Sequence, residues 1–198
     1  MPAPAPAPVP IVFVPASADA EGPSTRIGGQ PAWLEAPQWP LSRELGEPMR
    51  FFGQFRIDPD DEGDPALAYL FITDGHTSVD GTYDPEGGEN ALVVQPGGRL
   101  PDFVRSRSDE RGPTFGTAHV PSPAQLPAGQ SQPWQFLGGP GIEPVWLQGE
   151  ETPGPDWQLV VQLDSGDLPF PVDFGDGGVG YAFVSPDRKE GRFLWQST

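Results

Sequence analysis

Hydrophobic and polar positions along this chain form short apolar runs that Gly, Pro and Asp separate. The runs are rich in β-branched and aromatic side chains, which is typical of β-strands. We predict an edge strand at residues 10–15, with prolines at its ends. Further strands are predicted at Met49–Ile57, Ala66–Thr73, Ala91–Gln95, Gln158–Asp164, Val179–Ser185 and Phe193–Gln196. Helical turns are expected only at Pro40–Leu45 and around Asp102–Arg107, so the pattern predicts a mainly β fold with little helix.

Three sequence blocks recur in the same order, which predicts an internal repeat. The first copy contains Ile27-Gly-Gly-Gln-Pro-Ala-Trp-Leu34, Phe51-Phe-Gly-Gln-Phe55 and Ala68-Tyr-Leu-Phe-Ile72, and the second contains Leu137-Gly-Gly-Pro-Gly-Ile-Glu-Pro-Val-Trp-Leu-Gln148, Leu159-Val-Val-Gln-Leu163 and Gly180-Tyr-Ala-Phe-Val184. We therefore predict an internally duplicated, pseudo-two-fold domain over residues 10–198. Its halves are residues 10–95 and 134–198. Residues 96–133 hold seven prolines and are expected to form a long irregular connection.

The repeated polar and aromatic positions are the first candidates for a site. Trp33 and Trp146 each follow a Gly-Gly turn and offer a large face with an indole N–H that needs a partner. Gln54 and Gln162 each interrupt an apolar strand, and a buried amide there must be hydrogen-bonded. The two glutamines either bridge backbone at the seam between the halves or bind the backbone of a peptide partner.

A glycine-rich loop, Asp173-Phe-Gly-Asp-Gly-Gly-Val-Gly-Tyr181, joins two of the predicted strands. In one interpretation it is a tight turn in which Asp176 caps backbone amides. In the other, Asp176, Gly177 and Gly178 form an amide-lined nest or a ligand-facing loop.

Other possible chemistry has little support in the sequence. Asp58-Pro-Asp-Asp-Glu-Gly-Asp64 partly imitates a calcium loop, but Tyr69 stands where the twelfth-position Glu belongs. His76 and His119 have no metal-ligand spacing, and we interpret them as surface loop residues. No nucleophile, phosphate-binding or dinucleotide motif is present. We therefore expect neither catalysis, nor a metal, nor a cofactor.

Composition and charge restrict the partners. The chain has 198 residues, including 28 Pro and 26 Gly, and residues 1–9 predict a flexible Ala/Pro arm. Its formal net charge is −17, which disfavours binding to nucleic acid or to anionic membrane and favours a basic protein partner. It contains no Cys, and no segment is typical of a signal peptide or membrane span. We expect a cytoplasmic location, and the pattern does not indicate an oligomeric state.

The motifs also resemble a known family. Residues 27–34, 46–55 and 174–183, with Phe193-Leu-Trp195, are similar to the YwqG-like bacterial family of unknown function and to the programmed-cell-death-protein-2 group of ribosomal-protein chaperones. The resemblance implies a duplicated β fold and a protein-binding role, near toxin–immunity loci in bacteria. Where the eukaryotic group has paired cysteines, this chain has Gly46 and Glu47, so no metal-stabilised knuckle is expected.

These observations favour a non-catalytic protein- or peptide-binding module, chaperone-like or toxin-neutralising (immunity-type). The partner-binding candidates are Trp33, Gln54, Trp146, Gln162, Asp176, Gly177 and Gly178. A structural subunit of a larger assembly, tethered by the Ala/Pro arm, is the first alternative. A hydrolase or transferase that uses carboxylates around Asp176 is a weaker one.

Overall fold

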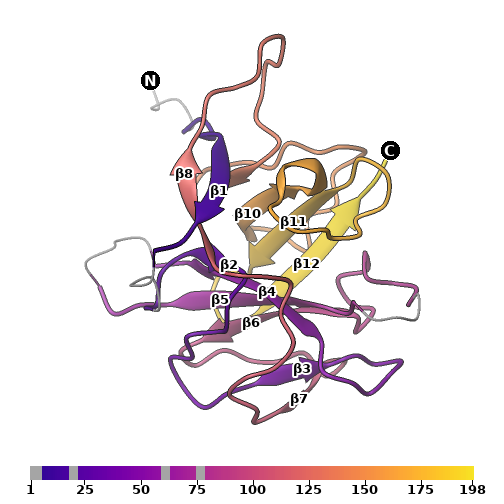
Figure 1. Cartoon of the computed structure of the whole chain (residues 1–198). Helices are drawn as coiled ribbons and strands as arrows, with labels where there is room; N and C mark the ends of the chain where they lie inside the picture. The colour runs from indigo at the N-terminus through magenta and orange to yellow at the C-terminus, as the bar shows by residue number, and fades with distance from the viewer. Residues whose placement is uncertain (1–5, 18–21, 59–62, 75–78) are drawn as a thin grey trace.

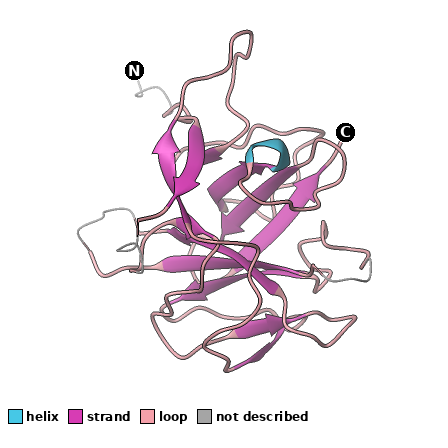
Figure 2. Ribbon diagram, viewed as in Figure 1, coloured by secondary structure: helices cyan, strands magenta, loops and turns pink. Residues whose placement is uncertain are grey.

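The computed structural model describes residues 6–17, 22–58, 63–74 and 79–198, and it is mainly β, as predicted (Figures 1 and 2). The strands are β1 (Ile11–Pro15), β2 (Arg26–Ile27), β3 (Trp39–Leu41), β4 (Arg50–Arg56), β5 (Leu67–Ile72), β6 (Asn90–Gln95), β7 (Arg105–Arg107), β8 (His119–Pro123), β9 (Phe136–Leu137), β10 (Gln158–Asp164), β11 (Val179–Val184) and β12 (Gly191–Gln196). Within the described residues the only helical element is the 3-10 turn Ser165–Asp167. In this part of the chain no helix is long and apolar enough to cross a bilayer.

The strands form two main sheets and a small ribbon. One sheet has six strands in the order β1-β8-β2-β4-β5-β6, the other has four in the order β12-β11-β10-β9, and β3 pairs with β7. All of these strand pairings are antiparallel. In Figure 1 the β3–β7 ribbon lies below β4–β6, and β10–β12 lie above them.

The apolar runs predicted the main strands well. Residues 158–164 form a strand with the predicted bounds, and the other predicted strands differ by at most two residues at either end. Strands β5, β6 and β11 are buried at every position, because the sheets are covered on both faces. This is why their sequences are apolar runs rather than alternating patterns.

The two predicted helical turns are wrong. Trp39–Leu41 and Arg105–Arg107 are strands, and they pair with each other in the register Trp39↔Arg107 and Leu41↔Arg105. Each segment is short and has no clear period of its own, so the long-range pairing decided its conformation. The helical turn instead follows Asp164, whose side chain accepts from the N–H of Gly166.

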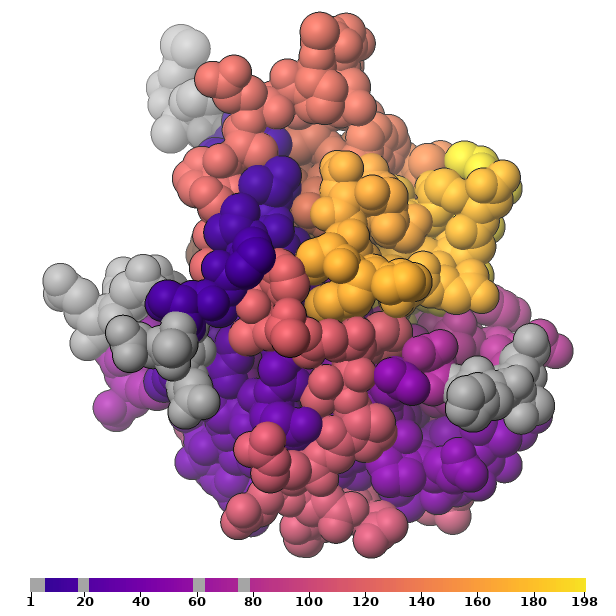
Figure 3. Space-filling model, viewed as in Figure 1, coloured from indigo at the N-terminus to yellow at the C-terminus, as the bar shows by residue number. Residues whose placement is uncertain are grey.

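The connection between the halves also contributes a strand to the main sheet. β8 lies between β1 and β2, although it contains Pro121 and Pro123. These prolines stand opposite Ile11 and Phe13 of β1. Hydrogen bonds lie at both ends of the β1–β8 pair: the N–H of Ala124 donates to the carbonyl oxygen of Pro10, and the N–H of Ala16 donates to that of Ala118. Ladder bonds to β1 alternate along the strand, so both prolines occupy positions where β1 needs no donor. In Figure 3 this part of the chain forms a salmon band down the visible face.

The core has three layers of buried side chains. A central cluster lies between the two sheets and includes Phe52 and Leu70 from one sheet and Leu163 and Phe193 from the other. A second cluster covers the outer face of β4–β6, and a third covers the outer face of β9–β12. Because the central cluster draws on both halves, the halves share one core.

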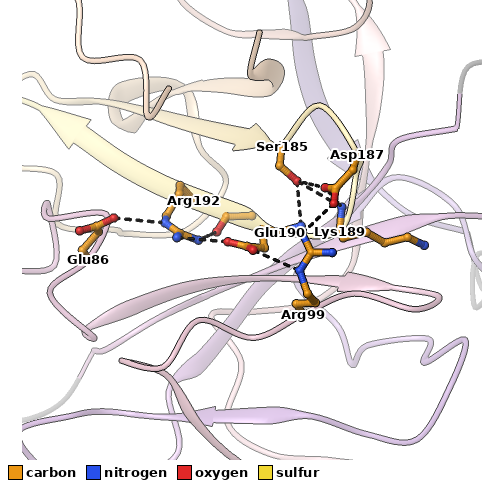
Figure 4. Close-up of polar contacts among 8 residues, drawn as sticks. Glu86, Arg99, Ser185, Asp187, Lys189, Glu190 and Arg192 are labelled. Atoms are coloured by element: carbon orange, nitrogen blue, oxygen red, sulfur yellow. Dashed lines mark hydrogen bonds and ion pairs between the residues drawn. The ribbon is translucent and has the colours of Figure 1, made fainter. Parts of the chain in front are cut away.

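The two halves also meet along β6 and β12. A side chain at Gly191 would lie 2.3 Å from the carbonyl oxygen of Leu92, so the two backbones are in close contact. Beside this contact Arg99 pairs with Asp187 at 2.7 Å and with Glu190 at 3.2 Å (Figure 4). The backbone N–H of Arg99 also donates to the carbonyl oxygen of Lys189, so this corner is held by both main chain and side chains.

Candidate functional site

The first repeated loop, residues 28–35, is called here the Trp33 loop. Gly28 and Gly29 adopt φ angles of +68° and +70°, which strain any residue with a side chain. The N–H of Gly28 donates to the carbonyl oxygen of Phe52 at 2.7 Å. This turn lays the indole of Trp33 on Tyr69 and Phe71, with ring centroids 4.9 Å and 6.0 Å apart.

Three buried polar side chains hold the backbone of the Trp33 loop. Gln54 accepts from the N–H of Ala32 at 2.9 Å. The hydroxyl of Tyr69 donates to the carbonyl oxygen of Ala32 at 2.8 Å and accepts from the N–H of Leu34 at 3.1 Å. Gln95 accepts from the same N–H of Leu34 at 3.1 Å. The loop is therefore fixed on the sheet by side chains from β4, β5 and β6.

The second repeated loop, residues 138–148, is called the Trp146 loop and makes the corresponding contacts. Gln162 accepts from the N–H of Val145 at 2.8 Å. The hydroxyl of Tyr181 donates to the carbonyl oxygen of Val145 and accepts from the N–H of Leu147. The ring of Trp146 lies 4.6 Å from that of Tyr181, close to the 4.9 Å of the first half. One contact pattern thus occurs in both halves; that the halves arose by duplication stays a prediction.

The buried glutamines serve the loops of their own halves. Gln54 also donates to the carbonyl oxygen of Ser24, and Gln162 to that of Trp134. Each glutamine therefore bridges backbone within one half, and none of these bonds crosses the seam where the sequence placed them. The other proposed role, binding a peptide backbone, stays a prediction.

Sequence reasoning missed a further buried glutamine in each half. Gln95 ends β6 and Gln196 ends β12, and both are buried. Gln196 accepts from the N–H of Gln148 at 2.9 Å and donates to the carbonyl oxygen of Gly149 at 2.7 Å. A glutamine at the end of the third strand of each copy was the available signal.

Burial of the two tyrosines changes their ionisation. Desolvation raises the pKa of Tyr181 to about 12, although the hydrogen bond from Leu147 acts in the opposite direction. Desolvation likewise raises the pKa of Tyr69, opposed by the hydrogen bond from Leu34. Both hydroxyls consequently stay protonated at neutral pH and can donate to the loop carbonyls.

The Trp33 loop binds an extended segment of its own chain, residues 105–112, called here the covering segment. The indole N–H of Trp33 donates to the carbonyl oxygen of Glu110 at 3.0 Å. The amide of Gln30 donates to the carbonyl oxygen of Gly112 at 2.9 Å and accepts from its N–H at 3.1 Å. Backbone atoms, rather than particular side chains, are what this loop recognises.

A groove borders the Trp33 loop. It consists of two adjoining pockets of about 510 Å³ and 400 Å³, which share Gln30, Pro31 and Arg111. The larger pocket reaches the end of β1 at Pro15, and the smaller one reaches Trp33. Side chains of both charges line the groove, among them Arg111, Glu35 and Glu110, which gives it a surface suited to a peptide rather than to an apolar ligand.

The glycine-rich loop before β11 lies against the last residues of the chain, Ser197 and Thr198. The side chain of Asp173, not that of Asp176, accepts a backbone N–H, from Gly175 at 2.9 Å. The side chain of Asp176 is exposed. The backbone carbonyl oxygen of Asp176 accepts from the N–H of Thr198 at 3.0 Å. An Asx turn of the predicted kind is therefore present, but Asp173 forms it instead of Asp176.

The glycines of this loop have separate roles. Gly177 has a φ of +56°, a conformation that a turn of this kind requires. Gly178 is buried, and a side chain there would lie 1.8 Å from the carbonyl oxygen of Phe174. Both positions are therefore explained by the turn and its packing, and the ligand-binding alternative stays a prediction.

The remaining candidate ligands do not converge. His119 lies in β8, where its Nδ1 is 2.8 Å from the carbonyl oxygen of Thr117, so it is a strand residue rather than a loop residue. His76 and residues 59–62 of the calcium-like run lie outside the described residues. Asp58 pairs with Arg56; burial alone would raise the pKa of Asp58, but bonds from Arg56 and the Ala66 N–H lower it. Among the described residues no three His, Asp or Glu side chains could together hold a metal ion.

Comparison with known proteins places the chain in no established group. No model of a protein family matches it, and none of the curated proteins is significantly similar to it. The resemblance to YwqG-like proteins therefore stays a prediction, and the argument about function depends on the geometry of the two tryptophan loops.

Proposed function

We propose that this protein is a non-catalytic module that binds an extended segment of a partner protein, in a chaperone-like or toxin-neutralising role. The observation that supports it most directly is the Trp33 loop, which already binds a backbone carbonyl and a backbone amide of the covering segment. A second loop with the same internal bonds carries Trp146. A scaffold that positions two such loops by buried amides and hydroxyls is rigid, which reduces the entropic cost of binding.

The charge of the chain suggests the character of the partner. A net charge of −17 attracts basic proteins over long range and accelerates their association at low salt. We propose that the partner is basic and that the complex forms in the cytoplasm, by direct contact and without a cofactor.

Reconstitution of a complex tests the proposed function. The tagged protein is used to recover partners from its native host at low and at high salt, and each candidate is then purified and titrated by calorimetry. We expect a one-to-one complex whose association rate falls as salt rises. A protein that forms no stoichiometric complex with any purified candidate, at any ionic strength, would contradict the proposal.

The carboxylate-dependent hydrolase proposed as an alternative makes a different prediction for Asp176. Its side chain is exposed and forms no hydrogen bond or ion pair within the part of the chain that the structure describes. If Asp176 acts as a catalytic acid or base, Asp176→Asn abolishes the host phenotype in a folded protein; a variant that keeps the phenotype and still binds the ligand contradicts this alternative.

A further inference from the structure

The outer faces of the two sheets are built alike but are covered differently. Over β4–β6 lie the β3–β7 ribbon and the covering segment (Figure 1). Trp39 in this layer is fully buried, and Met49 and Val104 are also buried. The ring of Trp39 contacts both Trp33 and Phe71 edge-on, so a second tryptophan completes the cover of the first.

The outer face of β9–β12 has no fully buried tryptophan in its cover among the described residues. The apolar side chains over it come from residues 134–157, and they remain partly exposed: Trp134, Ile142, Val145, Trp146, Leu147 and Trp157. Among the described residues no ribbon equivalent to β3–β7 crosses this face. Trp146 stacks on Tyr181 and Phe183, but no further aromatic ring in the described chain takes the place that Trp39 has beside Trp33.

The two indole N–H groups differ in the same way. Trp33 donates to the carbonyl oxygen of Glu110 in the covering segment. Trp146 has no acceptor within the part of the chain that the structure describes, although the bonds that hold its loop match those of the Trp33 loop. A donor held in this orientation is suited to a carbonyl from another chain.

Charge indicates what kind of segment fits this face. Residues 138–157 contain Glu143, Glu150, Glu151 and Asp156 and no Lys or Arg, and none of these acids forms an ion pair with a described residue. Arg192 of β12 lies 5.5 Å from the centroid of the Trp157 ring, but its ion pairs are with Glu86 and Glu190. The covering segment over the first sheet, by contrast, has three arginines and two acids in its eight residues, and Arg107 pairs with Asp109 at 3.1 Å.

At least one of these acids is near the loop. Desolvation is the main reason why the pKa of Tyr181 is raised to about 12, and the negative charge of Glu151 adds to it. The backbone beside Glu150 and Glu151 is also fixed at the loop, because the amide of Gln196 donates to the carbonyl oxygen of Gly149 at 2.7 Å.

We propose that the outer face of β9–β12 around Trp146 binds an extended, arginine- or lysine-bearing segment of a partner protein. A backbone carbonyl of that segment accepts from the indole N–H of Trp146, and its cationic side chains lie beside Glu150 and Glu151. This segment covers the second sheet and accepts from its tryptophan N–H, as residues 105–112 do at the first sheet. This inference rests on the proposed function and adds the location of the site and the chemistry of the partner.

Calorimetric titration with defined peptides tests it. The probe is a blocked twelve-residue peptide of alternating Arg and Ser, compared with Gln–Ser and Glu–Ser peptides of the same length. We expect the Arg–Ser peptide alone to bind, and to bind more weakly as salt rises from 20 to 200 mM. Trp146→Phe keeps an aromatic side chain, smaller than the indole, and removes the N–H, so the dissociation constant should rise about fivefold. The double variant Glu150→Gln with Glu151→Gln should weaken binding at 20 mM salt and reduce its salt dependence.

The matched control is Trp195→Phe, because the N–H of Trp195 already donates to the hydroxyl of Thr82 at 3.2 Å. This variant should bind the Arg–Ser peptide as the wild type does. Equal losses in Trp195→Phe and Trp146→Phe, or binding that neither Trp146→Phe nor the Glu variants change, would overturn the assigned site. Binding of the Gln–Ser or Glu–Ser peptide that Trp146→Phe weakens would overturn the cationic partner while leaving a peptide-binding function intact. If none of the peptides binds the wild type, the inference fails, whereas the proposed function is decided by the complex with the native partner.

Discussion

At the scale of single residues, two hydroxyl groups stabilise the tryptophan loops. The hydroxyl of Tyr181 accepts one backbone N–H and donates to one backbone carbonyl, and that of Tyr69 does the same. Each hydroxyl thereby gives a hydrogen-bond partner to one backbone N–H and one backbone carbonyl of its loop, neither of which bonds to the backbone of a described strand. A buried polar group without a partner costs more than an ordinary hydrogen bond contributes.

Removing one hydroxyl tests this role. Tyr181→Phe leaves the N–H of Leu147 and the carbonyl oxygen of Val145 without a partner, so the free energy of unfolding should fall by about 1–3 kcal/mol. Urea denaturation measures the change. Tyr83→Phe is the control, because Tyr83 is 56% exposed and its hydroxyl makes no hydrogen bond with a described residue. Equal losses in both variants would contradict the role of Tyr181.

The same hydroxyls make stability depend on alkaline pH. The pKa of Tyr181 is about 12 in the folded protein, against about 10 for an unfolded chain. The unfolded state therefore releases its proton first, so stability is complete below pH 10 and falls as the pH rises toward 12. The urea midpoint measured from pH 8 to 11 should decrease, and Tyr181→Phe should reduce the slope. A midpoint that is constant across this range would contradict the prediction.

At the scale of elements, short segments far apart in the sequence assemble the cover of the first sheet. Buried Glu89 accepts from the hydroxyls of Ser42 and Thr73 and from the N–H of Glu44, and so joins the chain after β3 to the ends of β5 and β6. Gly112 then lies against the ring of Trp39 in β3. The β3–β7 ribbon is therefore held by polar contacts at one end and by close packing at the other.

A methyl group at Gly112 tests the packing. A Cβ there would lie 2.7 Å from the indole of Trp39, so Gly112→Ala should destabilise the fold by about 1–3 kcal/mol. It should also raise the exposure of Trp33, whose N–H is bound to this segment. Urea denaturation followed by tryptophan fluorescence measures both. Gly149→Ala is the matched control, because no atom lies within 4 Å of its Cβ position, and it should leave both readings unchanged.

At the scale of the whole molecule, the two halves are joined by a shared core and by the contact of β6 with β12. Arg99, Asp187 and Glu190 close one corner of this contact (Figure 4). The hydrogen bond from Ser185, and then that from Arg99, lower the pKa of Asp187 to about 2. The ionised carboxylate thus orders the β11–β12 turn and links it to the segment that follows β6.

This pKa predicts how the seam responds to acid. Because the folded pKa lies below the ordinary value of 3.8, the unfolded chain takes up a proton first. The contribution of Asp187 is present above pH 4 and is lost as the pH falls toward 2. Asp187→Asn should lower the urea midpoint at pH 6 and have less effect at pH 2. An equal effect at both pH values would show that the charge of Asp187 is unimportant.

Much of the fold could be predicted because the strands are local apolar runs. Each run ends at Gly, Pro or Asp, so a few neighbouring residues determine where the strand begins and ends. The repeated Trp, Gln and Tyr positions likewise indicated which side chains matter before their contacts were known. The exceptions were Trp39–Leu41 and Arg105–Arg107, whose conformation depends on a partner more than sixty residues away in the sequence.

By itself, the sequence determined the β class, the main strands and the two tryptophan loops, because local propensity and periodicity act over a few residues. Only the tertiary structure decided where the polar groups of those loops are satisfied. It placed Gln54 and Gln162 within their own halves rather than at the seam. It also showed that the N–H of Trp33 is bound by the chain itself, whereas that of Trp146 has no described acceptor. Hydrogen bonding and burial depend on which distant segments meet, and a linear pattern does not carry that information.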